Sequence, residues 1–216
     1  MSSIEPLLDG FRAFRGEYFE QHPEGYERLA REGQHPIAAV IACADSRVDP
    51  AILFGSGPGD LFVIRNVASL VPPYHPDDNL HGTSAAIEFA VRDLGVTHLI
   101  VLGHAQCGGV GAAIDSVRGQ PPARDFLAGW VRQLDAPCRT ALAMHHGDAV
   151  ACRPDAEHGS IARSVTNLRT FPWIAAAEQA RRLTLHGWWF DLIGGALEAV
   201  DPDTGTGRRL VPSPTT

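Results

Sequence analysis

Three short, nearly continuous apolar runs punctuate the first half of the chain, at residues 36–43, 61–64 and 97–102. Uninterrupted apolar runs of this length are typical of strands buried on both faces, as in a parallel sheet. Helical patterns occur at 85–94 and 110–117, each directly before or after a run. Strands that alternate with helices predict an α/β fold with a mainly parallel central sheet flanked by helices.

The second half of the chain has a less regular pattern. Residues 120–154 predict a mixture of helices and loops, and 167–182 predict a helix that is interrupted at its proline. The aromatic stretch 186–193 predicts a further strand. Two consecutive glycines after it favour a hairpin with a last strand at 196–200.

The two ends of the chain differ from this central pattern. About residues 1–32 predict a helical arm, because apolar positions near its start recur at three- and four-residue steps. These positions are Leu7, Phe11, Phe14 and Tyr18. Packing on the core of its own chain and packing on a second subunit are both open to this arm. We expect a poorly ordered tail at about 205–216 and, without a linker, a single domain over 1–216.

Composition and charge narrow the classes of protein. The 216 residues are 44% hydrophobic and 20% charged, which is an ordinary globular mixture. A net charge of −7 argues against a nucleic-acid partner, and no apolar run approaches the roughly 18–20 residues of a membrane span. Four cysteines are too few for a disulfide scaffold. The first residues do not resemble a signal peptide, which favours a cytoplasmic location with reduced thiols.

Two short polar segments, 43–47 (CADSR) and 104–107 (HAQC), carry the candidate chemistry. Each directly follows a predicted strand, and ligands of open α/β sheets bind at the carboxyl ends of strands. Together Cys43, His104 and Cys107 offer two sulfurs and one imidazole. This set suits tetrahedral Zn²⁺ and leaves the fourth position for water, which is the arrangement of catalytic zinc sites.

The remaining residues of the first segment suggest a further function. Asp45 lies two residues after Cys43 and is placed to accept the proton of that water in a hydrogen bond. Arg47, two residues further on, offers a bidentate guanidinium that holds an ionised Asp45. The other cysteines, 138 and 152, are expected to be unliganded thiols, and the histidines at 145, 146 and 158 to be solvated loop residues.

The combination resembles the β-class carbonic anhydrases over nearly the whole chain, from about Gly33 to about Val200. The motifs that carry this resemblance are 43–47, 59–66 (GDLFVIRN), 71–74 (VPPY), 84–89 (SAAIEF), 103–109 (GHAQCGG), 164–168 (SVTNL) and 186–191 (HGWWFD). It implies a parallel-centred α/β sheet and a homodimer or an assembly of dimers such as a homotetramer. It also implies an active-site cleft at the subunit interface.

Residue by residue, the resemblance implies that Cys43, His104 and Cys107 bind one Zn²⁺ per chain. It implies that Asp45 and Arg47 form the catalytic dyad. The substrate-binding positions that it implies are Gln34, Phe62, Val67, Phe89 and the backbone N–H of Gly108.

Two departures from the family pattern affect the expected site. Phe89 stands where plant-like members carry tyrosine, so one hydroxyl hydrogen bond is missing. Val40 stands where members with an inhibitory bicarbonate pocket carry tryptophan. Together with Gln34, Val40 favours an open site, in which water rather than Asp45 is the fourth ligand at neutral pH.

The implied activity is reversible hydration of CO₂ to bicarbonate and a proton by zinc-bound hydroxide. A hydrolase of CS₂ or COS on the same scaffold would carry the same metal ligands, so the motifs leave that alternative open. A zinc-dependent sensing module needs neither the Asp45–Arg47 pair nor Gln34, and a dithiol redox protein does not fit a chain without CxxC. The sequence identifies no proton shuttle, and His75 and His81 are the candidates considered for that role.

Overall fold

The computed structural model describes residues 3–214, and its centre is a six-stranded sheet in the order β2-β1-β3-β4-β5-β6. The strands are β1 Ala38–Cys43, β2 Leu61–Asn66, β3 His98–His104, β4 Thr184–Phe190, β5 Leu197–Val200 and β6 Gly207–Val211. Strands β1 to β4 pair in parallel with one another, whereas β4 pairs antiparallel with β5 and β5 pairs antiparallel with β6. The predicted α/β fold with a mainly parallel sheet is confirmed.

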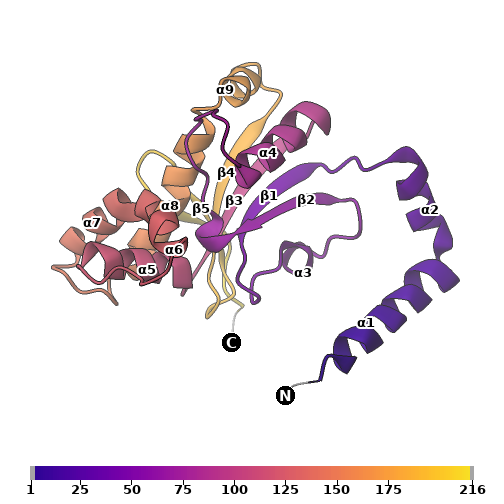
Figure 1. Ribbon diagram of the computed structural model, residues 1–216, viewed down its shortest axis with the longest axis horizontal. Coiled ribbons are helices and arrows are strands. Elements are labelled where there is room, and N and C mark those ends of the chain that lie inside the picture. The colour runs from indigo at the N-terminus through magenta and orange to yellow at the C-terminus, as the bar shows by residue number, and fades with distance from the viewer. Residues whose placement is uncertain (1–2, 215–216) are drawn as a thin grey trace.

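Helices surround this sheet, mainly along one face and at one end (Figure 1). They are α1 Glu5–Arg15, α2 Pro23–Glu32, α3 Pro50–Phe54, α4 Gly82–Glu88, α5 Gly108–Val117, α6 Leu127–Val131, α7 Asp135–Met144, α8 Arg153–Leu168 and α9 Pro172–Gln179. Short π-helical turns follow α1 and α4, and 3₁₀ turns occur at Val67–Ser69 and Arg132–Leu134.

The core has three parts because β1 and β3 are apolar on both faces. Ile41 and Val101 lie on the face that packs against α4, α8 and α9. Val40 and Ile100 lie on the opposite face, where α3 contributes Leu53 and Phe54. The third part lies beneath α5, α6 and α7, at the carboxyl end of β1, and includes Cys43 and Cys107. The continuous apolar runs of β1 and β3 therefore reflect burial on both faces, as expected. The run of β2 does not, because β2 lies at the edge of the sheet and only its Ile64 is buried.

The N-terminal arm, α1 and α2, extends away from the sheet at the right of Figure 1. Neither helix contains a buried residue, and Leu7 and Phe11 are 72% and 61% exposed. Packing of the arm on the core of its own chain is therefore wrong. The arm's aromatic rings instead pack on one another, as Phe14 and Tyr26 do at 5.6 Å between ring centroids.

Two further expectations about the second half differ from the structure. The helix expected at 167–182 is interrupted before its proline, as predicted, and continues as α9, but its first part begins much earlier, as α8 from Arg153. Buried polar residues such as Ser160 and Ser164 obscure the apolar pattern of α8, which is stabilised by packing on the sheet. The tail expected from 205 contains β6, whose residues are all exposed and are held by pairing with β5. Residues 215–216 of that tail lie outside the described part of the chain.

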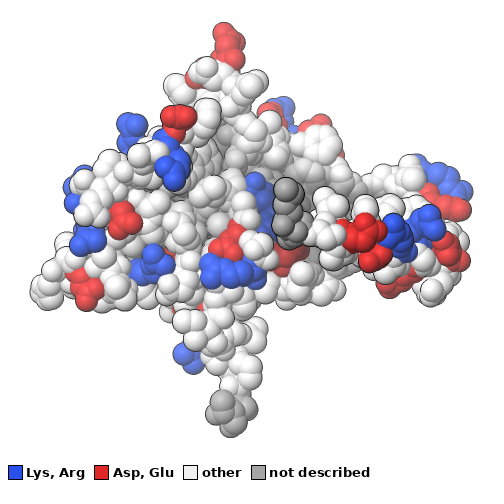
Figure 2. All heavy atoms as spheres, turned by 60° about the horizontal axis from the view of Figure 1, so that its bottom comes forward, with Lys and Arg blue, Asp and Glu red and all other residues white. Residues whose placement is uncertain are grey.

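On the face shown in Figure 2, acidic and basic side chains are interspersed and form no large area of a single sign. Among residues 3–214, no helix is both long and apolar enough to cross a bilayer.

His158, expected in a solvated loop, instead lies in α8 with a side chain that is only 12% exposed. Its ring packs edge-on against Trp189 at 4.9 Å between centroids. Burial lowers the pKa of His158, and the nearby carboxylates of Glu198 and Asp155 only partly offset this. The folded protein therefore favours the neutral imidazole more than the unfolded chain does.

This lowered pKa predicts a specific sensitivity to acid. The stabilising contribution of neutral His158 is complete above the unfolded pKa of about 6.5 and is lost as the pH falls through the lower folded value. We expect the melting temperature of His158→Gln to fall less than that of the wild type between about pH 7.5 and pH 5.5. His22→Gln, in the exposed arm, is the control. An identical fall in all three proteins would contradict the prediction.

Candidate metal centre

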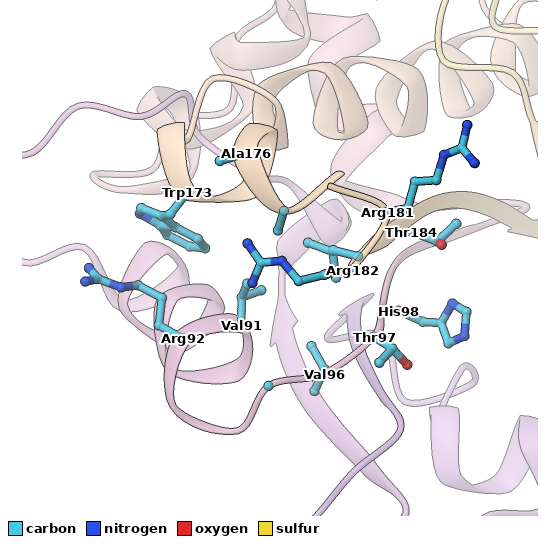
Figure 3. Close-up of a pocket in the computed structure, with 13 residues that line it drawn as sticks. Val91, Arg92, Val96, Thr97, His98, Trp173, Ala176, Arg181, Arg182 and Thr184 are labelled. Atoms are coloured by element: carbon cyan, nitrogen blue, oxygen red, sulfur yellow. The ribbon is translucent and has the colours of Figure 1, made fainter. Parts of the chain in front are cut away.

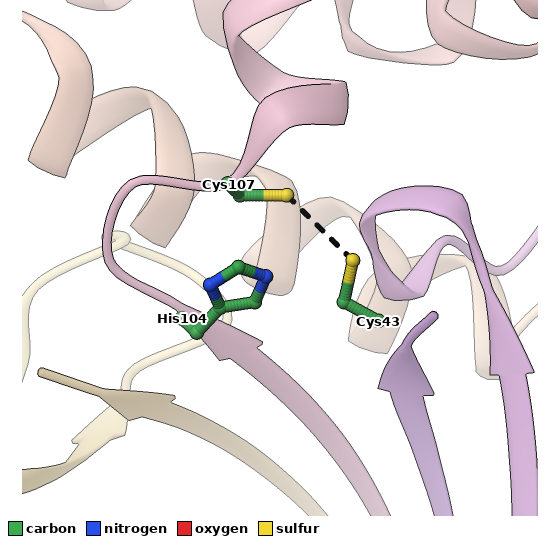
Figure 4. Close-up of side chains that lie close together, drawn as sticks. All are labelled: Cys43, His104 and Cys107. Atoms are coloured by element: carbon green, nitrogen blue, oxygen red, sulfur yellow. Dashed lines mark hydrogen bonds between the residues drawn. The ribbon is translucent and has the colours of Figure 1, made fainter. Parts of the chain in front are cut away.

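Three side chains from two strand ends converge at the carboxyl edge of the sheet. The candidate ligand atoms of Cys43, His104 and Cys107 all lie within 4.8 Å of one another, and all three residues are buried. The two Sγ atoms are 3.9 Å apart, with the imidazole beside them (Figure 4). Cys43 ends β1 and His104 ends the adjacent parallel strand β3, so the sheet itself brings the two segments together.

The start of α5 completes this cluster. Cys107 is the N-cap residue of α5, and the backbone N–H groups of Gly109 and Val110 act to lower the pKa of its thiol. The N–H of Ala68 donates to the sulfur of Cys43 at 3.4 Å. A Cβ at Gly109 would stand 2.9 Å from the Cβ of Ala68, so only glycine allows this approach. Backbone dipoles therefore surround both sulfurs and favour their thiolate forms.

The donor set fits a divalent metal ion. Nδ1 of His104 lies 2.8 Å from the carbonyl oxygen of Ala105, which makes it the donor. Nε2 is buried, has no hydrogen-bond partner among residues 3–214, and is left with a free lone pair beside the sulfurs. A metal-ligating histidine typically has this second contact. Two sulfurs and one such nitrogen suit Zn²⁺ with one open position.

The two thiols behave as a pair that shares one proton. Donation from the Cys107 thiol lowers the pKa of Cys43, with smaller contributions from His104 and backbone N–H groups. The same contact raises the pKa of Cys107. A metal ion held by both thiolates replaces the shared proton, because thiolate ligands must be deprotonated.

Asp45 and Arg47 form a bidentate ion pair next to this cluster. Arg47 donates from Nε to Oδ1 at 2.9 Å and from Nη2 to Oδ2 at 2.6 Å. These bonds hold the pKa of Asp45 well below its usual range, so its carboxylate stays ionised at neutral pH. Oδ2 lies 3.9 Å from Nε2 of His104, and Asp45 is outside the cluster of ligand atoms. The carboxylate thus stands beside the metal position without occupying it.

Arg65, which the sequence reasoning missed, holds the loop that carries this ion pair. It donates from Nε to the carbonyl of Cys43 at 3.1 Å and from Nη2 to the carbonyl of Asp45 at 2.6 Å. Its third contact is an ion pair with Asp49 at 2.8 Å. The sequence offered one indication of this role: Arg65 directly follows the predicted strand 61–64, and that strand was expected in the same sheet as 36–43.

Glu157 of α8, which the sequence reasoning also missed, supports the loop that carries Cys107. It is 3% exposed, and its two carboxylate oxygens accept from the backbone N–H of Cys107 and from Nε1 of Trp189, each at 3.1 Å. Burial raises its pKa, although these two donors oppose the shift. No local pattern marks this residue, because α8 begins far from the ligands in sequence.

We expect Glu157→Gln to weaken zinc binding. Glutamine offers one oxygen in place of two, so one buried N–H loses its acceptor, at a cost of about 1–3 kcal/mol. Loss of such a supporting contact lowers metal affinity by about 10–100-fold. Competition with a chelator measures the zinc affinity, and Glu88→Gln, in an exposed ion pair with Arg92, is the control. Equal affinity in the variant and the wild type would show that Glu157 only packs.

The residues expected to bind substrate fall into two groups. Val67 and Gly108 lie at the carboxyl edge of the sheet, beside the candidate ligands, which we call the metal edge. Val67 packs against Gly109, and Gly108 begins α5. Gln34 precedes β1, and Phe62 pairs with Ala39 near the opposite end of that strand. At roughly 3.3 Å per residue, the length of β1 alone is about 17 Å. One chain therefore does not bring Gln34 and Phe62 to its own metal cluster.

Phe89 belongs to the second group. Its ring centroid lies 5.9 Å from that of Phe62, and its side chain is 45% exposed. The two histidines considered as proton shuttles are not part of the ligand cluster and lie around Asp77. Nε2 of His81 is 2.6 Å from one carboxylate oxygen of Asp77, and Nε2 of His75 is 3.7 Å from the other. Their role in proton transfer stays a prediction.

An apolar hollow of about 680 Å³ opens next to Val67. Its wall includes Phe126, Leu127 and Trp130, and Nε1 of Trp130 donates to the carbonyl of Val67 at 2.8 Å. Phe126 is 88% exposed. This hollow adjoins the metal edge and offers an environment that an uncharged, weakly hydrogen-bonding molecule would enter.

A second hollow, of about 790 Å³, lies at the opposite edge of the sheet, where β3 and β4 begin. Arg92, Arg181 and Arg182 line it, which makes it a candidate for an anion. Figure 3 shows that their guanidinium groups point in different directions. The charges do not converge on one position, and we assign this hollow no part in the chemistry.

Cys138 and Cys152 lie outside the ligand cluster, as free buried thiols of the core beneath α5 to α7. The fold and the site together define a class: an α/β protein with a cluster of candidate metal ligands at the strand ends of a mostly parallel sheet. Comparison with known proteins specifies the family.

A family model described as carbonic anhydrase matches residues 38–197. A carbonic anhydrase of Pseudomonas aeruginosa is 40% identical over 211 residues, which cover 96% of this chain and 91% of the relative. The structure of the β-carbonic anhydrase CcaA superposes with a TM-score of 0.83 at 32% identity, covering 96% of this chain and 100% of that one. The chain therefore belongs to the carbonic anhydrase family, in its β class, and its enzyme class is carbonate dehydratase.

A third relative bears on assembly. A structure from the filamentous ascomycete Sordaria macrospora, described as one of two tetrameric β-carbonic anhydrases, superposes with a TM-score of 0.74 at 28% identity. The match covers 94% of this chain and 98% of that one. The arrangement of strands and helices is thus shared with a protein that assembles from several copies.

Proposed function

We propose that this protein is a zinc-dependent carbonic anhydrase that converts CO₂ and water reversibly to bicarbonate and a proton. The observation that supports this most strongly is the buried Cys43, His104 and Cys107 cluster, with a free imidazole nitrogen, beside an ionised Asp45. Zn²⁺ in this cluster supplies Lewis acidity that brings the pKa of a water at its open position toward about 7.

The residues of the chain would orient the reactants around that position. Asp45 accepts a hydrogen bond from the attacking water and so directs its lone pair toward carbon. Arg47 keeps the carboxylate ionised and in place. The free N–H of Gly108, at the start of α5, is a donor for the negative charge that develops on oxygen. Because Asp45 is bonded to Arg47 and lies outside the ligand cluster, we propose the open form of the site.

We infer that Gln34, Phe62 and Phe89 act in the site of a second subunit. One chain holds them away from its own metal edge, and its exposed apolar side chains are suited to cover a partner. Leu80 is fully exposed, and Val67 beside the metal edge is 39% exposed. The exposed arm and the tetrameric relative support the same assembly. Gln34 from the partner would then donate to the substrate, and the two phenylalanines would exclude water.

A subunit-mixing experiment tests this shared site. We expect Gln34→Ala and Asp45→Ala each to lower kcat strongly as pure proteins. Unfolding and refolding them together in equal amounts should restore about a quarter of the wild-type activity, because half of the randomly paired dimers are mixed and each holds one intact site of two. Mixed Asp45→Ala and Arg47→Ala proteins are the control, since both changes fall in the same site. No recovery in the first mixture would place Gln34 in its own chain's site.

The activity itself is tested on the purified wild-type protein. Metal analysis should find one zinc per chain, and a stopped-flow pH-indicator assay should detect CO₂ hydration. A zinc-binding module without turnover would contain the metal and fail the assay. Release of H₂S from CS₂ and COS is measured in parallel, and a higher kcat/KM for either compound would replace CO₂ as the proposed substrate. A cytoplasmic location with reduced thiols stays part of this proposal.

A further inference from the structure

The loop between two of the ligands contains a residue in an unusual conformation. Gln106, between His104 and Cys107, has a φ of 57°, in the left-handed region that side chains other than glycine rarely adopt. Such conformations persist only where surrounding contacts enforce them, and they gather at functional sites. The neighbours of Gln106 should therefore include the group that enforces this one.

That group is Arg153, at the first position of α8. Its Nη1 donates to Oε1 of Gln106 at 3.0 Å. The guanidinium lies over α5 at Gly111, where a Cβ would stand 2.5 Å from Nη2. Within residues 3–214, no carboxylate forms an ion pair with Arg153. The side chain is half-buried, and the amide of Gln106 is its hydrogen-bond acceptor.

The backbone of Gln106 contacts the catalytic ion pair. Its carbonyl oxygen accepts a hydrogen bond from Nη2 of Arg47 at 3.2 Å, and the same Nη2 donates to Asp45. A left-handed φ turns this peptide toward Arg47. Rotation of Gln106 to an ordinary φ would redirect its carbonyl and remove the hydrogen bond from Arg47 to Gln106. The bonds from Arg47 to Asp45 would then be left without this support. One chain of hydrogen bonds thus runs from Arg153 through Gln106 and Arg47 to Asp45.

Helix α8 also holds the next residue of the loop. One helical turn after Arg153, the carboxylate of Glu157 accepts from the N–H of Cys107. Residues four apart lie on the same face of a helix, so one face of α8 contacts two consecutive residues of the ligand loop. The two contacts have different targets: Glu157 holds a ligand, whereas Arg153 holds the residue that touches the dyad.

We propose that Arg153 is a positioning residue for the Asp45–Arg47 pair. It keeps Gln106 in the left-handed conformation, and the Gln106 carbonyl in turn fixes the plane of the Arg47 guanidinium and the direction of the Asp45 carboxylate. This inference rests on the proposed function, since it assigns a second layer of support to the same site. It concerns the orientation of the dyad and predicts no change in metal content.

A double-mutant cycle tests the proposal. Arg153→Met removes the hydrogen bonds and keeps much of the aliphatic packing. We expect kcat to fall about tenfold or more, with KM and the zinc content unchanged. Gln106→Gly adopts the left-handed conformation without strain. In that background we expect Arg153→Met to cause no further loss. Arg163→Met, exposed on the same helix, is the matched control and should retain wild-type kcat.

A second measurement does not depend on CO₂ hydration. The Nε–H proton of Arg47, bonded to Asp45, should give a slowly exchanging side-chain NMR signal in the wild-type protein. We expect Arg153→Met to speed its exchange, and Arg163→Met to leave it unchanged. If the wild type does not hydrate CO₂, the proposed function fails while this signal still tests the contact.

Three results would overturn the proposal. In the first, Arg153→Met lowers the melting temperature while kcat and the NMR signal of Arg47 stay as in the wild type. This result would show that Arg153 has a purely structural role. An equal loss of kcat in the wild-type and Gln106→Gly backgrounds would show that Arg153 acts by another route. Loss of zinc from the Arg153→Met protein would place its effect on the metal ligands rather than on the dyad.

Discussion

Replacing Cys107 with serine is expected to abolish zinc binding and CO₂ hydration together. A neutral hydroxyl is a poor substitute for a thiolate, which is the softer ligand that zinc prefers. The loss should exceed the about 10–100-fold change that follows removal of a supporting contact, because a direct ligand is gone. Cys43 and the free nitrogen of His104 alone leave the metal with two protein ligands.

Metal analysis after dialysis and the stopped-flow assay measure the two losses on one preparation. Cys138→Ala is the control, since that thiol is buried but lies outside the ligand cluster. It should retain zinc and activity even if it melts at a lower temperature. A Cys107→Ser protein with a full complement of zinc would show that the metal binds elsewhere, and the proposed site would be wrong.

Asp45→Ala is expected to separate the metal from the chemistry. The carboxylate is not one of the converging ligand atoms, so zinc should remain at one per chain. Its hydrogen bond to the attacking water is lost, and kcat should fall by about 10²–10⁴, the range of a positioned acid–base group. The change also leaves Arg47 without its bidentate partner.

The measurement is kcat with zinc content determined on the same sample. Asp115→Ala, which removes an exposed carboxylate on α5, is the control and should hydrate CO₂ as the wild type does. Wild-type kcat in Asp45→Ala would refute the assignment of the dyad while leaving the metal centre intact. Loss of zinc would instead make Asp45 a ligand, as in a closed site.

The sheet illustrates which structural features a single sequence can reveal. The strands β1, β2 and β3 were predicted from apolar runs. For β1 and β3 the run reflects burial on both faces, whereas β2 is an edge strand in which only Ile64 is buried. The hairpin of β4 and β5 was predicted from consecutive glycines. By contrast, β6 is exposed on every residue and gives no alternation, so only its ladder with β5 defines it.

The helices show the limits of periodicity. The start of α8 was missed because polar residues such as Ser160 and Ser164 occupy buried positions, where Ser164 accepts a hydrogen bond from the backbone N–H of Val71 in a distant loop. The arm was correctly predicted to be helical, since its apolar spacing is local. The spacing did not decide which surface its apolar face covers. Because α1 contains no buried residue, that surface is not the core of its own chain.

The sequence by itself determined the ligand set and its acidic neighbour, because Cys43, Asp45, His104 and Cys107 lie in two contiguous segments directly after buried strands. Such segments need only the sheet to bring them together. Only the tertiary structure decided which residues hold these segments in place. It also decided which expected substrate-binding residues one chain keeps away from its own ligands. The contact of Glu157 with Cys107 joins residues 50 positions apart, and that of Arg153 with Gln106 joins residues 47 apart. Contacts of this kind depend on how helices pack on the sheet, which no local pattern of residues encodes.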